Sequence, residues 1–282
     1  MKKIGFVDYY ISEWHANNYP AWIDEACQNA GLDYKVAYAW AELDTSLIDN
    51  VTTDEWCEKF GVERCATLEE LCEKSDVIVV LSPSYPEKHL PYAETVLKYG
   101  KRTYIDKTFA PDYATALKIF ELGEKYNTPF FSSSALRYAT ELNDVKVVAN
   151  MVTTGGGRTL DEYAVHQCEM IVKKIGTDVK SVVADIQGTQ VVAKIAFESG
   201  KSATLVYGVN FPFTVYMEAG EGPADERWAR VSSPFFKALI ADMVNFFETG
   251  DISFDVNETK AVIKLVETVL KARDNPGVVI EA

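Results

Sequence analysis

Residues 76–131 alternate between short apolar runs and longer segments of helical periodicity, and this alternation constrains the fold more than any other feature of the chain. Strands that alternate with helices in this way form a parallel sheet covered by helices on both faces. The sequence therefore predicts an α/β fold. The expected elements are strands within 76–81, 103–106 and 129–131 and helices near 87–98 and 112–125.

Lys107 directly follows the expected strand at 103–106, so it stands at the carboxyl edge of the predicted sheet. Ligands of open α/β sheets bind outside this edge, and a charged side chain placed there by a rigid strand can face a substrate. A solvated loop lysine is the alternative interpretation. The motifs around Lys107 favour a site.

Two segments carry motifs in a fixed order. They are Ser82-Pro83, His89, Gly100-Lys101 and Asp106-Lys107-Thr108 in the first, and Gly156 to His166 followed by Gly176 in the second. Together they resemble the Gfo/Idh/MocA family of glucose-fructose oxidoreductases and inositol dehydrogenases. Two of the three residues of the family's Glu-Lys-Pro signature differ here, although the lysine remains. The resemblance implies an NAD(P)-dependent oxidoreductase.

The resemblance also implies two domains with a boundary near residue 139. We expect a Rossmann-like doubly wound parallel sheet for dinucleotide binding in residues 1–138. Residues 139–282 are expected to form a smaller C-terminal α+β domain, with a mostly antiparallel sheet, for substrate binding and oligomerisation. Its first expected element is a helix over Leu142–Val152, which the glycines at 155–157 end as a flexible connection.

The segment after the first strand departs from the family's Gly-x-Gly-x-x-Gly loop, because Asp8, Tyr10 and Glu13 occupy the glycine positions. Glycines let a pyrophosphate approach the helix N-terminus closely, whereas carboxylates repel it and a tyrosine adds bulk. We therefore expect weak or unconventional dinucleotide binding, either in a remodelled pocket or in a domain that has lost the cofactor. The aromatic residues could also fold inward over the sheet edge. The next helix is expected to begin near Asn18 and Pro20.

Glu42 follows the second expected strand, where an acidic residue binds the ribose in dinucleotide folds, so it favours NAD over NADP. A solvated carboxylate is the alternative. His89 either contacts ligand or packs against a neighbour. Arg137 matches an arginine of the family, and its alternative role is an interdomain ion pair. The candidate cofactor-binding residues are Asp8, Tyr10, Ser12, Glu42, Ser82, Pro83, His89, Asp106, Lys107 and Arg137.

Glu162 and His166 are four residues apart in a helix expected over 159–174, so their side chains share a face. The family resemblance implies that His166 exchanges a proton with the substrate hydroxyl and that Glu162 orients it. Lys107 would hold or polarise the same oxygen from the first domain, which completes the catalytic set Lys107, His166 and Glu162. Glu169 adds a third possible metal ligand on this helix, but a second group of ligands is missing, so we expect no metal.

The chain is acidic, with 42 Asp and Glu against 28 Lys and Arg and a net charge of -14. This charge argues against nucleic acid and anionic membranes as partners. No run approaches the roughly 20 apolar residues that cross a bilayer. The five cysteines lack a paired metal-binding pattern, which indicates reduced thiols and a cytoplasmic protein.

The function that we expect is NAD(P)-dependent oxidation or reduction of a sugar, polyol or related hydroxy compound. A homo-oligomer is expected from the resemblance and from the free face of the second sheet. The alternative function is a non-catalytic relative that binds a sugar, a nucleotide or a protein partner. Lys107 and His166 favour the enzyme, and the altered loop at 8–13 favours the alternative.

Overall fold

The computed structural model describes residues 1–219 and 226–282, and these form two compact units. The first unit comprises residues 1–132 and 237–253, and the second comprises residues 133–236 and 254–282. Residues 237–253, which were expected in the second domain, therefore pack with the N-terminal part of the chain.

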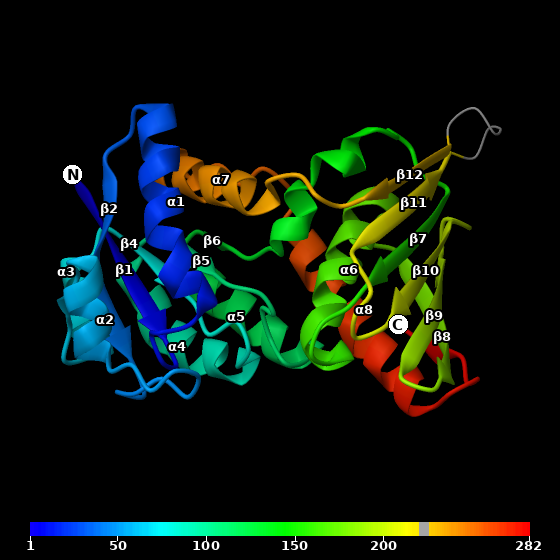
Figure 1. Cartoon of the computed structure of the whole chain (residues 1–282), viewed down its shortest axis with the longest axis horizontal. Coiled ribbons are helices and arrows are strands. Elements are labelled where there is room, and N and C mark those ends of the chain that lie inside the picture. Colours follow the sequence, from blue (N-terminus) through cyan, green and yellow to red (C-terminus); the bar gives the residue numbers. More distant parts are fainter. Residues whose placement is uncertain (220–225) are drawn as a thin grey trace. The chain divides into compact units, whose positions relative to one another are not determined.

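A six-stranded sheet forms the centre of the first unit, in the order β3-β2-β1-β4-β5-β6, with all neighbouring strands parallel. This confirms the predicted Rossmann-like sheet (Figure 1). β1 pairs with β2 on one side and with β4 on the other, so the strand order reverses there, at the point where α/β folds bind ligands. The strands are β1 Lys2–Asp8, β2 Tyr34–Ala41, β3 Glu63–Arg64, β4 Val77–Val80, β5 Thr103–Ile105 and β6 Phe130–Phe131.

Helices connect these strands, and the helix α1 begins earlier than expected. It spans Trp14–Ala30 with Glu13 as its N-cap, so the expected start near Asn18 and Pro20 is wrong. Proline is best tolerated in the first turn, which suggested the later start. Burial of Ala16 and Tyr19 together with the Glu13 cap stabilises the additional turn. The other helices are α2 Thr53–Phe60, α3 Leu68–Lys74, α4 His89–Val96 and α5 Tyr113–Tyr126, with 3-10 turns at Pro86–Lys88 and Leu97–Tyr99.

Most of helix α7, Phe235–Thr249, belongs to the first unit. The ring of Phe246 lies 5.0 Å from that of Phe131 in β6, in an edge-on arrangement. The Tyr34 hydroxyl donates a hydrogen bond to the carbonyl of Phe247 at 2.9 Å, and Arg102 Nη1 donates to the same carbonyl at 2.6 Å. These contacts account for the assignment of α7 to the first unit.

The second unit contains a sheet in the order β12-β11-β7-β10-β9-β8-β13 over the described residues. Neighbouring strands are antiparallel except for β7 and β10, which confirms the mostly antiparallel sheet. Buried and half-exposed residues alternate along β7, β10 and β11, so one face of the sheet packs and the other stays open. The strands are β7 Asn150–Gly155, β8 Val179–Gln187, β9 Gln190–Phe197, β10 Ser202–Tyr207, β11 Thr214–Glu218, β12 Glu226–Arg230 and β13 Ile280–Glu281.

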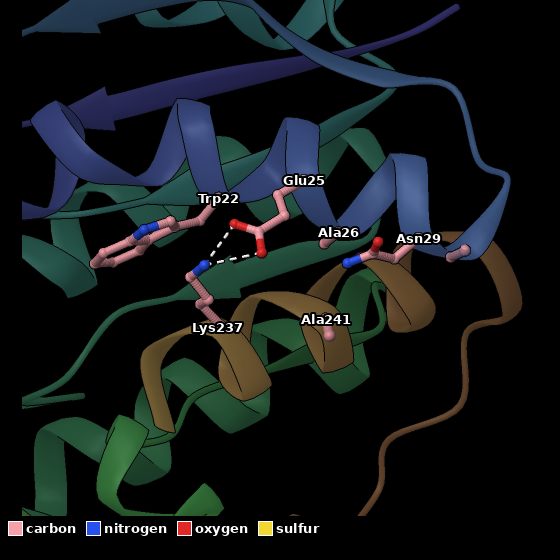
Figure 2. A pocket seen from close by; sticks show the side chains of 7 residues that line it. Trp22, Glu25, Ala26, Asn29, Lys237 and Ala241 are labelled. Atoms are coloured by element: carbon pink, nitrogen blue, oxygen red, sulfur yellow. Dashed lines mark hydrogen bonds and ion pairs between the residues drawn. The ribbon is translucent and has the colours of Figure 1, made fainter. Parts of the chain in front are cut away.

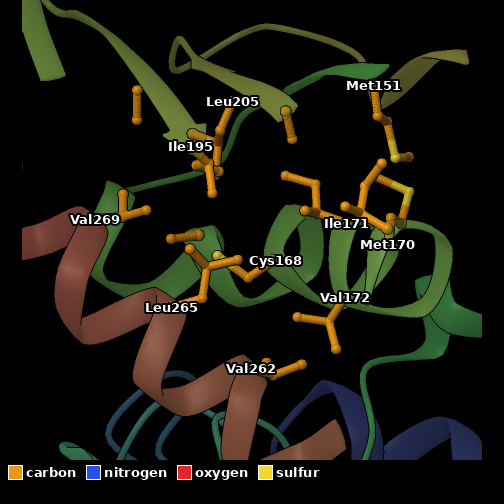
Figure 3. Packing of buried hydrophobic residues seen from close by; sticks show 14 of the residues in the cluster. Met151, Cys168, Met170, Ile171, Val172, Ile195, Leu205, Val262, Leu265 and Val269 are labelled. Carbon is orange, nitrogen blue, oxygen red and sulfur yellow. The ribbon is translucent and has the colours of Figure 1, made fainter. Parts of the chain in front are cut away.

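Helices α6, Leu160–Ile175, and α8, Asn257–Asp274, cover the packed face of this sheet (Figure 1). Side chains from the sheet and from both helices meet in one core, in which Met151 and Leu205 point toward α6 (Figure 3). Short 3-10 turns at Ala135–Tyr138 and Thr140–Asn143 precede the first strand. The core therefore fixes α6, the helix that carries His166.

The expected helix over Leu142–Val152 is wrong. Its last residues form strand β7 instead, which pairs with β10 and β11. The segment is rich in valine and continues into Thr153 and Thr154, and such β-branched residues favour strands. Alternating burial along β7 shows that a period of two, rather than 3.6, governs this stretch.

The glycines after β7 are closely packed and do not form a flexible connection. A Cβ atom at Gly156 would lie 2.1 Å from the carbonyl oxygen of Gly208, and one at Gly157 would lie 2.3 Å from the ring of Tyr163. Only glycine therefore fits at Gly156, because the neighbouring atom is backbone. This close approach brings the loop against the start of α6.

Candidate functional site

Asp8 joins the carboxyl ends of β1 and β4. Its Oδ1 accepts hydrogen bonds from the backbone N–H groups of Tyr9 at 2.7 Å and Ser82 at 3.0 Å, and the Ser82 hydroxyl lies 3.2 Å away. Ser82 has a φ of 65°, a left-handed conformation that is uncommon for serine and that these bonds stabilise. Two predicted cofactor-binding residues thus bind each other at the point where the strand order reverses.

Burial raises the pKa of Asp8 well above its usual range, and the nearby Glu13 carboxylate raises it further. The folded protein therefore keeps the Asp8 proton at pH values where the unfolded chain has lost it. Below the ordinary pKa of about 4, Asp8 is protonated in both states and the free energy of unfolding is not reduced by it. As the pH rises from there toward the folded-state pKa, the unfolded chain loses this proton and the free energy of unfolding falls.

We expect Asp8→Asn, which cannot ionise, to gain stability relative to the native protein as the pH rises above about 4. The difference should grow by up to about 1.4 kcal/mol per pH unit, because one proton is linked to unfolding. Urea unfolding at several pH values measures it. Asp49→Asn is the control: although burial alone would raise the pKa of Asp49, its hydrogen bonds, with Ser12 foremost, lower it, so its difference from the native protein should change only below about pH 4 and with the opposite sign. A difference for Asp8→Asn that is independent of pH would contradict the prediction.

The aromatic residues of the loop at 8–13 fold inward. Tyr10 is buried, and its ring lies 5.9 Å from that of Tyr9 and 5.7 Å from that of Tyr85. The Ser12 hydroxyl donates to Asp49 at 2.8 Å, and the Ser12 carbonyl accepts from Ser46. The loop is thus a packed structure that uses the side chains of two further candidate residues, Tyr10 and Ser12.

Glu13 occupies the N-terminus of α1 with its own carboxylate. This carboxylate accepts hydrogen bonds from the backbone N–H groups of His15, at 2.8 Å, and Ala16. Glu13 is only 5% exposed, and burial raises its pKa. In dinucleotide folds, the N–H groups of the first helical turn hold the pyrophosphate. In this conformation a pyrophosphate therefore does not fit at α1, because a side chain of the protein takes its place.

Asp106 and Lys107 lie together at the carboxyl edge, directly after β5. Asp106 Oδ2 binds Nδ1 of His15, while Oδ1 accepts from the Tyr104 hydroxyl at 3.1 Å and from the backbone N–H of Lys107 at 2.8 Å. Burial alone would raise the pKa of Asp106, but His15 and Lys107 lower it. Lys107 is 9% exposed, and its Nζ lies 3.3 Å from the carbonyl oxygen of Pro83. The structure therefore brings Pro83, Asp106 and Lys107 together.

Sequence reasoning missed His15. Its ring is buried, stacks on Tyr19 at 5.1 Å between centroids, and binds Asp106, which lies 91 positions away in the sequence. The available signal was a histidine in the turn that follows the altered loop, beside the end of β1. Because the start of α1 was not known, the position of His15 in the sequence did not identify Asp106 as its hydrogen-bond partner.

Glu42 and His89 are both engaged by neighbouring groups. Glu42 accepts from Lys88 at 2.6 Å and from the Tyr92 hydroxyl at 2.7 Å, and these bonds outweigh the effect of burial and lower its pKa. His89 is fully buried, with Nδ1 at 3.0 Å from the Phe109 carbonyl and Nε2 at 2.6 Å from the Leu81 carbonyl. Only an imidazolium could donate both bonds, and burial lowers the pKa of His89, which opposes that form. These contacts support a structural role for His89.

His166 lies on α6, and its Nδ1 is 2.7 Å from the hydroxyl oxygen of Ser134. Both carboxylate oxygens of Glu162 accept from the Arg158 guanidinium, at 2.5 and 3.0 Å. Glu162, in the first turn of α6, thus forms an ion pair with Arg158, which lies just before the helix. Sequence reasoning missed Ser134, which lies outside the family motifs that define the site.

Arg137 is buried in the second unit and forms an ion pair within that unit. Its Nε binds Glu169 at 2.5 Å, its Nη1 binds Glu258 at 2.7 Å, and its guanidinium lies 4.1 Å above the Phe254 ring. Buried charges are stable only when paired, so these contacts explain why an arginine stands here. The Glu169 carboxylate is used by the same network and is buried as well.

In the ranges that the structure describes, no group of three or more histidine, cysteine, aspartate and glutamate side chains is arranged to hold a metal ion. No helix within 1–219 or 226–282 is both long and apolar enough to cross a membrane. All five cysteines are buried and unpaired.

A hollow of about 210 Å³ lies between α1 and α7 (Figure 2). It is lined by Trp22, by small side chains such as Ala26 and Ala241, and by an exposed ion pair between Glu25 and Lys237 at 2.7 Å. An exposed pair of this kind contributes at most about 1 kcal/mol. The hollow contains none of the candidate site residues, so it does not identify the site.

Residues 41–133 match the family model described as "Oxidoreductase family, NAD-binding Rossmann fold" of the GFO_IDH_MocA type. The match begins after β1 and excludes the altered loop at 8–13. A comparison with curated protein sequences found no match.

Solved structures with the same fold include several dehydrogenases. A scyllo-inositol dehydrogenase from Lactobacillus casei with bound NAD(H) and scyllo-inositol has a TM-score of 0.76 and 15% identity, over 99% of this chain and 98% of that one. An oxidoreductase from Agrobacterium radiobacter in complex with NAD+, L-tartaric acid and magnesium has a TM-score of 0.78 and 12% identity, over 99% and 98%. A dehydrogenase from Clostridium difficile has a TM-score of 0.74 and 13% identity, over 96% and 99%. These similarities extend over nearly the whole chain and establish its fold.

Proposed function

We propose that the chain, whose residues 41–133 match the Gfo/Idh/MocA model of NAD-binding oxidoreductases, interconverts a hydroxyl and a carbonyl group on a sugar, polyol or related compound. Solved structures of the same fold include an inositol dehydrogenase, which supports a carbohydrate-like substrate. Lys107 carries the proposal, because its side chain is nearly buried at the carboxyl edge, inside the matched segment.

We propose that Lys107 binds and polarises the substrate oxygen. Its Nζ is placed beside the Pro83 carbonyl, after a strand that cannot move without disrupting the sheet. A lysine has three donors, and one bond to a carbonyl leaves donor capacity for a ligand. His166 exchanges the proton of the same oxygen, because imidazole is the side chain best suited to proton transfer near neutral pH.

A nicotinamide is the expected partner for the hydride, and we propose NAD in preference to NADP. Glu42 supports this choice because its carboxylate, directly after β2, would repel a 2'-phosphate. Glu13 argues for an unconventional position of the pyrophosphate or for weak binding.

Turnover and ligand binding test this proposal together. The purified protein should oxidise at least one member of a panel of inositols, sugars and sugar acids with NAD or NADP, followed by absorbance of the reduced nicotinamide. Calorimetry with each dinucleotide measures binding without turnover. No turnover with any panel member, combined with no dinucleotide binding, would overturn the enzyme assignment.

A second candidate function is non-catalytic binding of a sugar, nucleotide or protein partner, and the Glu13 cap favours it. If the Glu13 carboxylate always caps α1, the pyrophosphate of the cofactor cannot bind at its usual position. The reaction would then have no hydride acceptor. Binding of an inositol or a sugar to a protein that neither binds dinucleotide nor turns over would establish this alternative.

We also propose that the protein is a homo-oligomer formed through the open face of the second sheet. Apolar and aromatic side chains gather on this face in paired positions, with Val152 opposite Tyr216 and Tyr216 opposite Trp228. Trp228 is 64% exposed, which is unusual for a side chain with no interface. Light scattering should give a multiple of 31.5 kDa, and a monomer at micromolar concentrations would contradict the proposal.

A cytoplasmic location likewise stays a proposal, which the unpaired cysteines support.

A further inference from the structure

Ser134 is placed to control the orientation of the His166 ring. Its hydroxyl oxygen lies 2.7 Å from Nδ1 of His166, and the serine itself is fully buried. The same oxygen accepts a hydrogen bond from the backbone N–H of Leu136 at 3.2 Å, because Ser134 is the N-cap of the 3-10 turn at Ala135–Tyr138. The hydroxyl is thus held by the backbone on one side and contacts the imidazole on the other.

Glu169 fixes the backbone of Ser134 against the helix that carries His166. The Ser134 N–H donates to Glu169 Oε2 at 3.2 Å, and the Ser133 hydroxyl donates to Oε1 at 3.3 Å. His166 and Glu169 are three positions apart on α6, so they lie on one face and contact adjacent serines. Glu169 is itself held by the buried Arg137 at 2.5 Å. Ser134 and His166 therefore belong to one rigid network.

A hydroxyl suits a histidine that gains and loses a proton. It has one hydrogen and two lone pairs, and the Leu136 N–H uses one lone pair. The other lone pair accepts from Nδ1–H, both while Nε2 is free to act as a base and after Nε2 has taken a proton to form the imidazolium. The contact is thus retained in both forms without movement of the ring.

We propose that Ser134 is the positioning residue of His166 and directs proton exchange to Nε2. This inference rests on the proposed function for its catalytic meaning. It reassigns to Ser134 the orienting task that the family motif gave to Glu162, whose two carboxylate oxygens both bind Arg158.

Nitrogen NMR of the imidazole rings tests the inference without a substrate. The chain has three histidines, His15, His89 and His166, and the His166→Gln variant assigns the third. In Ser134→Ala, the Nδ1 and Nε2 signals of His166 should move, because the tautomer balance and ring order change, while those of His15 and His89 stay. Thr153→Val is the matched control, since it removes a buried hydroxyl that binds Gln167, the neighbour of His166 on α6, and it should leave the His166 signals nearly unchanged.

Ser134→Cys keeps the test valid if the alanine variant does not fold. A thiol fills nearly the same space but is a weak hydrogen-bonding group, so the His166 signals should move in the same way. Native His166 signals in a folded Ser134→Ala or Ser134→Cys protein would overturn the inference. Where the enzyme assignment holds, Ser134→Ala should also lower kcat about tenfold or more with little change in KM. If the protein proves to be non-catalytic, the NMR result still decides whether Ser134 positions His166.

Discussion

Lys107→Ala and His166→Ala should each lower kcat about 100-fold or more, and the double variant should lose little beyond the worse single variant. Each substitution removes an interaction that is made mainly in the transition state. One supplies positive charge to the reacting oxygen, and the other exchanges its proton. Residues that act on the same step are strongly non-additive, because the step already fails when either is missing.

Steady-state kinetics of the four proteins with one active substrate measure this effect. Lys101→Ala is a matched lysine control, because Lys101 Nζ donates a hydrogen bond to the backbone carbonyl of Glu73 at 3.0 Å and so stabilises the C-terminal end of α3. It should lower stability while kcat is preserved. Glu162→Gln should reduce kcat less than either main variant. Circular dichroism confirms folding, and full turnover by both folded single variants would exclude the pair as the catalytic centre.

Glu13→Gly should strengthen dinucleotide binding about tenfold or more, which is the second large effect. The substitution frees the first N–H groups of α1 and removes a buried carboxylate from the position of an anionic pyrophosphate. A tenfold change corresponds to about 1.4 kcal/mol, which is within the range of one charge interaction at a partly buried helix end. Glycine is also an acceptable N-cap, so the loss of helix stability should be small.

Calorimetry with NAD and NADP measures the gain. Asp112→Gly is the control, because it removes a carboxylate N-cap from α5 at a position outside the altered loop. It should cost similar stability, about 1 kcal/mol or less, and leave dinucleotide affinity unchanged. The structure also favours this single change over replacing Asp8, Tyr10 and Glu13 together, since Asp8 and Tyr10 are packed into the fold. Unchanged affinity in the folded Glu13→Gly protein would show that the cap does not limit binding.

The parallel sheet was predictable because its strands are buried on both faces. β4 and β5 consist of fully or nearly fully buried residues, and such strands appear in a sequence as continuous apolar runs. The position of Lys107 then followed from the end of β5. The alternating strands of the second sheet were predictable for the related reason that one face packs on helices. The 150–155 strand was not, because a short valine-rich run fits both periods.

Contacts between distant residues could not be predicted. The binding of His15 to Asp106 and of Ser134 to His166 depends on the relative placement of elements 91 and 32 positions apart. Glu13 was recognised as an obstacle to phosphate but not as a helix cap, because N-caps are usually Ser, Thr, Asp or Asn. Its role required the actual start of α1. The position of a charged side chain was therefore predictable from the sequence, but the group to which it binds in the folded protein was not.

The assignment of α7 to the first unit has a consequence for the order in which the protein matures. When residue 132 leaves the ribosome, every strand of the first sheet has been made, but the helix that covers Phe131 and accepts from Tyr34 and Arg102 is still more than 100 residues from synthesis. Strands β7 to β12 of the second sheet must be translated before the last helix of the first unit is made. A fragment that ends at residue 138 would therefore lack part of its own core.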